Sequence, residues 1–395
     1  MMKRLAKIIV VSVLGWQVRR LTSKHSFKTI AVVGSIGKTS TKSAIATMLG
    51  NKYRVMYQNG NYNDLVSVPL VYFGQDIPPI LNIVKWLALL LKNERKLRQP
   101  YPFDFVVLEL GTDAPGQIEQ FGRFVDADLA VVTALTQEHM ENFNDIRDVA
   151  QEELSVASFS KVVLVNSQLC PKNLLGDVKY KLYGEDVGSE YWLYSVQAAE
   201  AVAAHFGMSK QEIKNGKKQI KPMLGRMNRL DGIKESIIID DTYNSSPDAA
   251  IAALGVLRGS NSPQKIAILG SMNELGAVSA ESHSQVGKVC QPSWLDCVVT
   301  IGEEANRYIA PVAKENGCKV FEFTNPKLAG KYVRSVVESG AVVLAKGSQN
   351  GVFAEEAVKE LLADSKDVSK LVRQSKSWMS KKNRQFEGLS TKYAE

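Results

Sequence analysis

The chain has 395 residues, of which 45% are hydrophobic and 23% charged, a composition typical of a globular protein with two or three domains. The ends carry the net charge of +8: residues 1–28 and 366–395 together contribute +12, which leaves the body at −4. This charge balance argues against a nucleic-acid-binding groove across the body. The four cysteines lack the spacing of metal ligands, which argues against a zinc site and favours buried thiols in a reducing cytoplasm.

Residues 1–28 form the first predicted unit, a short basic helix. The apolar run Ile8–Leu14 follows basic residues and is far shorter than the ~20 residues that a transmembrane helix needs. No small-residue cleavage site follows it, so a signal peptide is not expected. Two interpretations remain open: the helix packs on the body, or the basic ends of the chain make peripheral contact with an anionic membrane.

Residues 29–225 predict a central α/β domain of the P-loop type. Four apolar runs in it are typical of buried strands: Lys28–Val33, Phe105–Leu110, Leu129–Ala134 and Val162–Asn166. Helical patterns lie between them, so a parallel sheet with helices on both faces is expected. The apolar stretch Ile80–Leu91 predicts a core or surface helix, with a membrane-facing patch as the alternative.

Residues 226–364 predict a second, smaller Rossmann-like α/β domain. Its expected strands are Ser236–Asp240, Lys265–Leu269, Cys297–Ile301 and Ala341–Ala345, and a helix is expected at Asp248–Leu257. The stretch from 224 to 232 contains two glycines and two arginines with little apolar periodicity, which favours a hinge. Residues 365–395 are polar and basic, and they predict a frayed helix or a tail.

The strongest local motif is GSIGKTS at 34–40, between a predicted strand and a predicted helix. Its glycines allow backbone N–H groups to turn toward phosphate oxygens, and the helix N-terminus adds positive potential. The strict pattern GxxxxGK[ST] is not met, because Val32 replaces its first glycine. We expect the lysine to reach the phosphates of ATP and the threonine to bind Mg²⁺. The residues predicted to bind the nucleotide here are Gly34, Ser35, Gly37, Lys38, Thr39 and Ser40.

Eight segments, in order along the chain, resemble the Mur ligase family and most closely its MurF branch. A match in one segment would be weak, whereas an ordered set is specific. The segments are GSIGKTSTK (34–42), NYNDLVSVP (61–69), VLELGTDAPGQIEQF (107–121), TALTQEHMENF (133–143), GRMNRLDG (225–232), IIDDTYNSSPDA (238–249), AILGSMNELGAVSAESHSQVG (267–287) and VLAKGSQNG (343–351).

The resemblance implies a role for particular residues. The implied catalytic residues are Lys38, Glu109, His139, Arg226 and Lys346. The implied Mg²⁺ ligands are Thr39, Glu109, His139 and Glu153, the last standing where the family places a carbamylated lysine. Arg226, Asp241 and Asn244 are implied to contact the nucleotide, and Ser348 and His283 the substrates.

The implied activity is ATP-dependent amide-bond formation through an acyl-phosphate. The chain would add D-alanyl-D-alanine to UDP-MurNAc-tripeptide in peptidoglycan synthesis, as a cytoplasmic monomer. Three departures keep alternatives open, the first of which is Glu153 in place of the carbamylated lysine. The phosphate loop starts at residue 34, so the uridine-side domain that precedes it in the family is expected to be absent, and the adenine-contacting segment is altered at 194–199. The alternatives are a ligase for another acceptor (poly-amino-acid or amidating) or a catalytically weak nucleotide-binding scaffold of cell-wall synthesis.

Overall fold

The structure is a computed structural model that describes residues 2–387 apart from 59, 61, 80–81 and 189–190, with side chains from Lys7 onward. Residues 80–81 of the predicted apolar helix and 388–395 of the predicted tail therefore lie outside the described residues. The chain forms two compact units. The first comprises Met1–Thr136, Asn142–Val187 and Trp192–Lys221, and the second comprises Gln137–Glu141, Gly188–Tyr191 and Pro222–Glu395.

The first unit contains a six-stranded parallel sheet in the order β2-β3-β1-β4-β5-β6. Alternate residues of β1 face opposite sides of the sheet, so Ile30 and Val32 join one core while Ala31 and Val33 join the other. The strands are β1 (Lys28–Val33), β2 (Val55–Met56), β3 (Phe105–Glu109), β4 (Leu129–Val132), β5 (Val163–Asn166) and β6 (Lys181–Tyr183).

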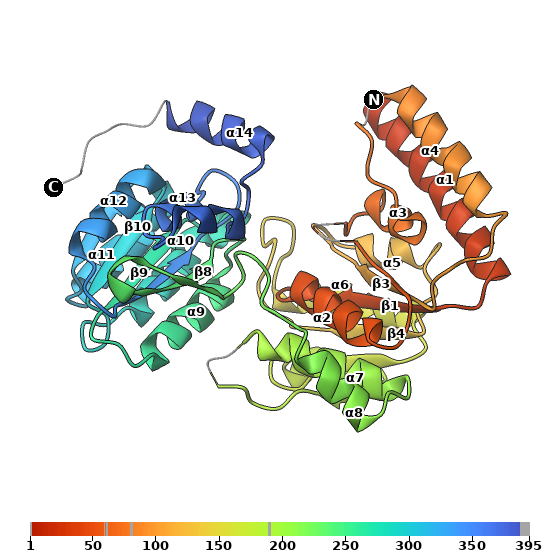
Figure 1. Cartoon of the computed structure of the whole chain (residues 1–395), viewed down its shortest axis with the longest axis horizontal. Helices are drawn as coiled ribbons and strands as arrows, with labels where there is room; N and C mark the ends of the chain where they lie inside the picture. The colour runs from red at the N-terminus through yellow and green to blue at the C-terminus, as the bar shows by residue number, and fades with distance from the viewer. Residues whose placement is uncertain (1, 59, 61, 80–81, 189–190, 388–395) are drawn as a thin grey trace. The chain divides into compact units, whose positions relative to one another are not determined.

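Helices cover both faces of this sheet (Figure 1). One face is covered by α2 (Lys38–Gly50), α7 (Leu193–His205) and α8 (Lys210–Lys217). The other is covered by α1 (Met2–Lys24), α3 (Ser67–Phe73), α5 (Gln117–Phe121), α6 (Ile146–Leu154) and the 3-10 helix η1 (Ser155–Phe159), with η2 (Lys172–Leu174) at its edge. Helix α4 (Ile83–Lys96) lies alongside α1, where Trp86 and Leu89 pack against Leu14 and Leu70.

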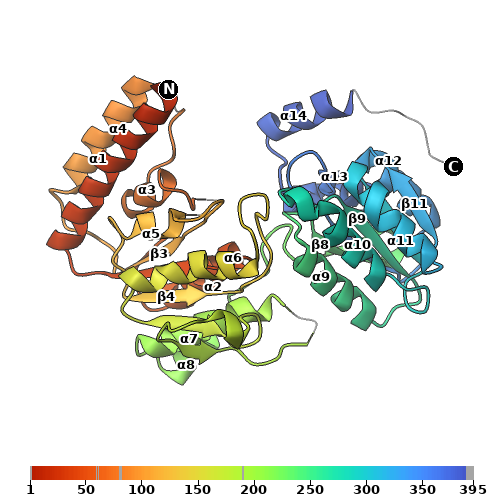
Figure 2. The ribbon, with the colours of Figure 1, turned by 180° about the vertical axis from the view of Figure 1, so that it is seen from behind.

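The second unit contains a six-stranded sheet in the order β11-β10-β9-β12-β8-β7 (Figure 2). All neighbours are parallel except β7 and β8, so the sheet is mixed at one edge. The strand β7 lies inside the stretch predicted as a hinge. The strands are β7 (Asn228–Asp231), β8 (Ile237–Asp241), β9 (Lys265–Gly270), β10 (Cys297–Ile301), β11 (Val320–Phe323) and β12 (Val342–Lys346).

Two helical layers sandwich this second sheet. One consists of α9 (Pro247–Gly259), α10 (Ser279–Val289), the π-helix η5 (Ala305–Ile309) and α11 (Ala310–Glu315). The other consists of α12 (Pro326–Val336) and α13 (Glu355–Lys359). Short turns are η3 (Ile233–Glu235) and η4 (Gly276–Val278). The predicted fold class, a parallel α/β sheet domain followed by a second α/β domain, is confirmed.

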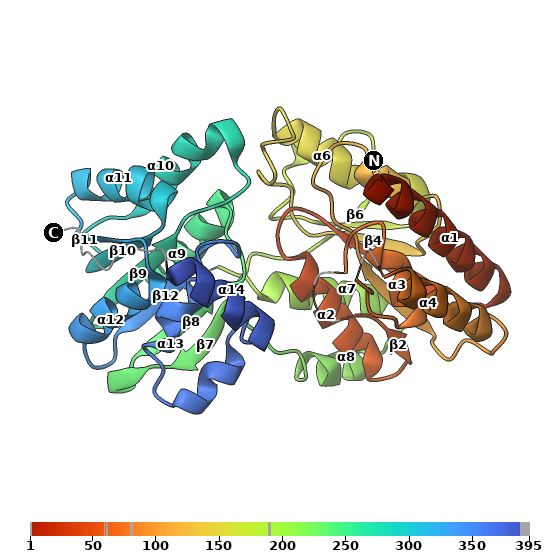
Figure 3. The ribbon, with the colours of Figure 1, turned by 90° about the horizontal axis from the view of Figure 1, so that it is seen from above.

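Of the two alternatives predicted for the C-terminal segment, a frayed helix or a tail, its described part is helical. Residues Ser365–Lys370 form η6 and Lys376–Phe386 form α14, which begins at the side-chain cap Ser375. Figure 3 shows α14 next to α13. Lys382 is fully buried there and contacts the carboxylates of Glu355 and Glu356. One of the basic residues of α14, Lys382, is therefore matched by acidic residues of α13, whereas the neighbouring Lys381 is exposed.

Candidate functional site

The loop between β1 and α2 has the backbone that a phosphate loop requires. Gly34 and Gly37 adopt φ values of 120° and 84°, in the region that favours glycine. A Cβ atom on Gly34 would lie 2.4 Å from the hydroxyl of Thr133, so no other residue fits there. The Ser35 N–H donates to the carbonyl of Ala134 (2.9 Å), which ties the loop to the end of β4. Ser40 follows in the first turn of α2.

Lys38 is folded back over this loop. Its Nζ donates to the carbonyl oxygens of Gly34 (2.5 Å) and Ser35 (3.4 Å). The side chain is half-buried, and the Ser35 hydroxyl is itself held by the backbone of Thr136. A cation curled over backbone carbonyls at a helix N-terminus is placed to exchange these contacts for phosphate oxygens.

Glu109 is the last residue of β3 and one of the most buried carboxylates of the first unit. Its Oε1 accepts hydrogen bonds from the Thr39 hydroxyl (3.1 Å) and the Asn63 amide (3.3 Å). Its Oε2 lies 3.0 Å from the Nζ of Lys42, which is equally buried. Lys42 is not among the predicted site residues, although it stands in the matched segment GSIGKTSTK.

Glu153 is also brought to the phosphate loop, from helix α6 on the other side of the sheet. Its side chain is almost fully buried, and its Oε2 accepts a hydrogen bond of 2.8 Å from the Gly34 N–H. The neighbouring Glu152 has a separate task, because it accepts from the N–H groups of Gly116 and Ile118 at the start of α5. The carboxyl group of Glu153 is therefore the one fixed directly behind the phosphate loop.

The groups of this region that could bind Mg²⁺ are side-chain oxygen atoms. Thr39 Oγ1 and Glu109 Oε1 lie 3.1 Å apart, and Mg²⁺ commonly binds one or two such protein oxygens together with phosphates and water. Among the described residues, no three His, Cys, Asp or Glu side chains come together as a metal-binding group. The residues present therefore fit a metal that is held mainly by its nucleotide.

His139 belongs to the segment 137–141, which groups with the second unit. Its Nδ1 lies 3.2 Å from Oε2 of Glu274, and its Nε2 lies 3.8 Å from Glu138. The hydrogen bond from His139 lowers the pKa of Glu274 below its usual value, against the opposing effect of burial. His139 adopts a positive φ of 52°, as Glu274 does at 65°, so both ends of this contact lie on irregular backbone.

In the second unit, the predicted nucleotide and amine residues meet at the carboxyl ends of two parallel strands. β8 ends at Asp241 and β12 at Lys346, and the two residues lie in register. The Nζ of Lys346 donates to Oδ2 of Asp241 (2.6 Å) and to the carbonyl of Asn244 (2.9 Å). Because Lys346 is buried, its charge is matched by Asp241 rather than by water.

Arg226 stacks on Tyr243, which is not among the predicted site residues. Its guanidinium carbon lies 4.2 Å from the ring centroid of Tyr243, in a cation–π contact. On the same ring, the guanidinium of Arg373 lies 6.0 Å away. Arg373 donates to the carbonyls of Thr242 and Tyr243 and forms a two-fold contact with Glu355 at 2.8 and 2.7 Å. The C-terminal segment thus holds the 241–244 loop.

Ser348 and His283 both support backbone in the second unit. The Ser348 hydroxyl accepts from the N–H of Asn273 (2.9 Å) and donates to the carbonyl of Ser245 (3.3 Å). His283 is fully buried: Nε2 accepts from the N–H of Met272 (2.9 Å), and Nδ1 donates to the carbonyl of Ser279 (2.8 Å). Burial lowers the pKa of His283, which favours the neutral ring that this pattern requires.

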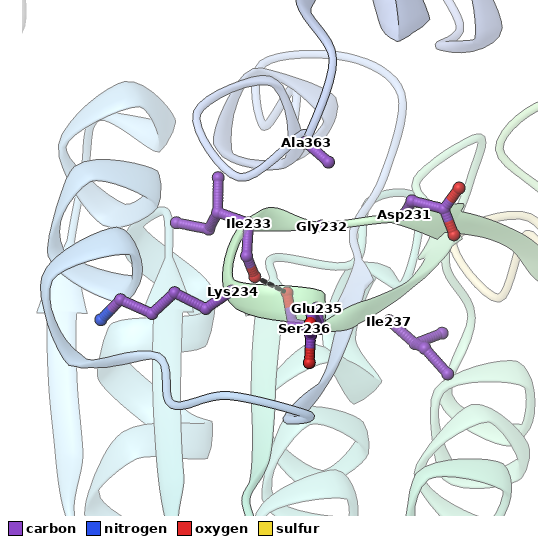
Figure 4. A pocket seen from close by; sticks show the side chains of 8 residues that line it. All are labelled: Asp231, Gly232, Ile233, Lys234, Glu235, Ser236, Ile237 and Ala363. Carbon is purple, nitrogen blue, oxygen red and sulfur yellow. Dashed lines mark hydrogen bonds between the residues drawn. The ribbon is translucent and has the colours of Figure 1, made fainter.

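A hollow in the second unit lies away from these residues. Figure 4 shows its lining, which consists of Asp231, Gly232, Ile233, Lys234, Glu235, Ser236, Ile237 and Ala363. It lies at the start of β8, whereas Asp241 marks the end of that strand. Ligands of open α/β sheets bind at the carboxyl ends of the strands, so this hollow is on the wrong edge to be the site.

Comparison with known families covers most of the chain. The family model for the Mur ligase middle domain matches residues 32–228, and the model for the Mur ligase glutamate ligase domain matches residues 225–349. The two matches meet within the stretch that the sequence predicts as a hinge. They contain the phosphate loop, Glu109, Asp241 and Lys346.

Similar proteins are named for one activity. The UDP-N-acetylmuramoyl-tripeptide–D-alanyl-D-alanine ligases of Bacillus subtilis and Haemophilus influenzae are 26% and 25% identical over 372 and 381 residues. Each match covers 85% of this chain and 76% or 77% of the relative. MurF of Acinetobacter baumannii (TM-score 0.71, 21% identity, 88% of this chain and 79% of that one) and MurF of Thermotoga maritima in complex with ADP (0.70, 21%, 91% and 84%) share the fold.

Proposed function

The chain belongs to the Mur ligase family, and from this premise we propose that it is an ATP-dependent ligase that adds D-alanyl-D-alanine to UDP-MurNAc-tripeptide in peptidoglycan synthesis. The relatives that cover 85% of the chain carry this activity in their names. The observation that carries the chemistry is the buried group of Thr39, Glu109 and Lys42 beside a glycine loop. This group suits transfer of a phosphoryl group from ATP.

The proposed reaction has two balanced steps. A carboxylate oxygen of the tripeptide attacks the γ-phosphorus of ATP, which forms an acyl-phosphate and releases ADP. The amine of D-alanyl-D-alanine then attacks the acyl carbon, the C–O bond to phosphate breaks, and the amine loses a proton. The products are the amide, ADP and phosphate. In such reactions the protein mainly aligns the reactants and neutralises developing charge.

In the first step, Lys38 leaves its loop carbonyls and binds the phosphates of ATP. Thr39 and Glu109 would hold Mg²⁺, which would neutralise phosphate charge. We assign Glu153 to the loop itself, where its carboxyl group fixes the N–H of Gly34. The family resemblance adds His139 as a further ligand. Gly34, Ser35, Gly37 and Ser40 shape the loop around the phosphates.

In the second step, the residues at the ends of β8 and β12 act. Lys346 binds the acyl-phosphate or the incoming amino component, and Asp241 contacts the ribose together with Asn244. The Lys346–Asp241 ion pair keeps both charges paired until the substrates arrive. Arg226 reaches the nucleotide from its stack on Tyr243. Ser348 holds the backbone that forms this edge, and His283 holds the loop next to it.

We further propose that the protein works in the cytoplasm, where ATP and the UDP-linked substrate are made, and that it is a monomer. Its basic ends are proposed to reach an anionic membrane surface. No helix in the described part of the chain is both long and apolar enough to cross a bilayer.

The test is phosphate release with ATP, Mg²⁺, D-alanyl-D-alanine and UDP-MurNAc-tripeptide, leaving out each component in turn. Release that requires both carbon substrates, with a product of their summed mass less water, is expected. Lys38→Ala is expected to abolish it, and substrate-dependent turnover in that variant would refute the loop assignment. If ATP binds but this pair gives no release, the activity belongs to another acceptor or the protein is a scaffold.

A further inference from the structure

Helix α4 presents an apolar face that nothing in the described structure covers. Ile83, Val84, Leu87 and Leu91 are 72%, 77%, 57% and 64% exposed. They follow the spacing of one helix face, whereas Trp86, Leu89 and Asn93 on the opposite face are buried. Isolated exposed leucines are ordinary in proteins, but four large aliphatic side chains in a row mark an interaction surface. We call these four residues the α4 outer face.

The apolar surface continues onto α1, which lies alongside α4 (Figures 1 and 3). Trp16 is 48% exposed, and its ring stacks on the guanidinium of Arg20 at 4.3 Å. Arg20 in turn bridges to Glu94 of α4 at 2.8 Å. Since Glu94 follows Leu91 by three residues and Leu87 by seven, Trp16 lies beside the same row of α4. Ile8 and Ile9, nearer the start of α1, are each 55% exposed.

The charges around this surface are almost all positive. Residues 83–98 contain five basic side chains and one acidic one, and residues 7–24 contain four basic and none acidic. Glu94 is the exception, and its charge is taken up by Arg20. Lys85, Lys92 and Arg95 are exposed on α4, and Arg98 is exposed directly after it. A basic rim around an apolar face is complementary to an anionic, apolar partner.

We propose that the α4 outer face, with Trp16, Ile8 and Ile9 of α1, docks on the surface of an anionic lipid bilayer. The helices lie in the interface plane: the aliphatic side chains enter the boundary of the acyl chains, and the lysines and arginines pair with lipid phosphates. Tryptophan suits this position because its ring is apolar and its N–H remains in the wet layer.

The membrane contact proposed for the basic ends of the chain is thereby placed on a defined surface, the α4 outer face with Trp16, Ile8 and Ile9. It shares with the proposed function only the idea of peripheral membrane contact, and its test does not use catalysis. A protein that binds vesicles without ligase activity, or a ligase that ignores vesicles, would separate the two.

The experiment is sedimentation of the full chain with vesicles of phosphatidylcholine alone or mixed with phosphatidylglycerol. Binding to the anionic vesicles is expected, with much weaker binding to neutral ones and at high salt. Leu87→Ser/Leu91→Ser is expected to lower the partition coefficient by about tenfold or more for each leucine. Lys85→Gln/Lys92→Gln is expected to lower it about fivefold per lysine.

Leu182→Ser is the matched control, because Leu182 is 49% exposed on β6 of the same unit. It is expected to bind as the wild type does, and circular dichroism checks that each variant is folded. No binding to anionic vesicles, or equal binding by the double leucine variant, would overturn the proposal. So would a concentration-dependent dimer that the leucine variant abolishes, because the surface would then join two copies of the chain.

Discussion

Replacing Lys382 by methionine should reveal how firmly the C-terminal segment is built into the second unit. The Lys382 ammonium is fully buried, 2.7 Å from Glu355 and 2.8 Å from Glu356. Methionine keeps the apolar stem and removes the charge. Arg373 still faces Glu355, and Lys359, which is 24% exposed, still faces Glu356. The buried carboxylates of Glu355 and Glu356 then face two remaining cations, of which Lys359 is partly screened by water.

The expected cost follows from these contacts. Removing one partner of a buried ion pair costs about 3–5 kcal/mol, because the remaining charge is left without compensation. Since two cations remain, we expect the lower end, about 3 kcal/mol at pH 7. With an m-value of about 2 kcal/mol/M, the urea midpoint of the second unit should fall by about 1–2 M.

The pH dependence gives a second check. Burial raises the pKa of Glu356, but the ammonium groups of Lys382 and Lys359 outweigh it and hold that pKa below its usual value. Its charge therefore stabilises the wild type above about pH 4.5, and this contribution is lost as the pH falls through the lower folded pKa. Without Lys382 the pKa of Glu356 should rise, so the difference between variant and wild type is largest near pH 7 and shrinks toward pH 4.

The assay is urea unfolding followed by circular dichroism and by tryptophan fluorescence, since Trp378 lies in α14. Lys381→Met is the matched control, because the neighbouring Lys381 is exposed and should cost no more than about 0.5 kcal/mol. Equal midpoints for the two variants at pH 7 would refute the buried ion-pair account, as would a cost that does not change with pH.

Three further outcomes are expected. Gly34→Ala should reduce phosphate release by at least about tenfold, because its Cβ would clash with Thr133 and the backbone is strained for alanine. Arg373→Lys should raise the KM for ATP by about tenfold and change kcat little, since lysine cannot hold the Tyr243 loop by a fork of donors; an unchanged KM contradicts this positioning role. His283→Ala should cost about 1–3 kcal/mol of stability in urea unfolding but spare turnover, and the cost should narrow below about pH 6.5, where the lowered pKa of the buried ring already weakens the wild type.

Which strands could be predicted follows from where they lie in the sheets. The predicted strands are the inner ones, such as β1, whose bounds Lys28–Val33 match the prediction. The strands that were not predicted are β2, β6, β7 and β11, and these are the four edges of the two sheets. Inner parallel strands are buried on both faces and read as apolar runs. The four edge strands are two to four residues long and partly exposed, so their sequences contain no such apolar run.

The same geometry explains which site residues the sequence could indicate. Gly34 and Glu109 stand directly after or at the carboxyl end of a strand, so a polar or glycine position follows an apolar run in the sequence. Asp241 and Lys346 also stand at strand ends, but it was the family resemblance that indicated them. The contacts that hold them are not local. Glu153 meets Gly34 across 119 positions. Arg373 lies in a basic, polar segment without apolar periodicity, so no sequence pattern linked it to the 241–244 loop.

Both strand-end sites pair a carboxylate with a buried lysine: the buried Glu109 with Lys42, and the partly buried Asp241 with Lys346. A phosphate that drew Lys42 away would leave the carboxylate of Glu109 buried and uncompensated, at a cost of several kcal/mol. A divalent cation beside Glu109 would remove that cost, because Thr39 and Glu109 already present their oxygens together. Nucleotide and metal should therefore enter the first unit as one species, and neither should bind well alone. The ion pair between Lys42 and Glu109, which stabilises the protein without its ligands, thus also selects for the metal-bound form of the nucleotide.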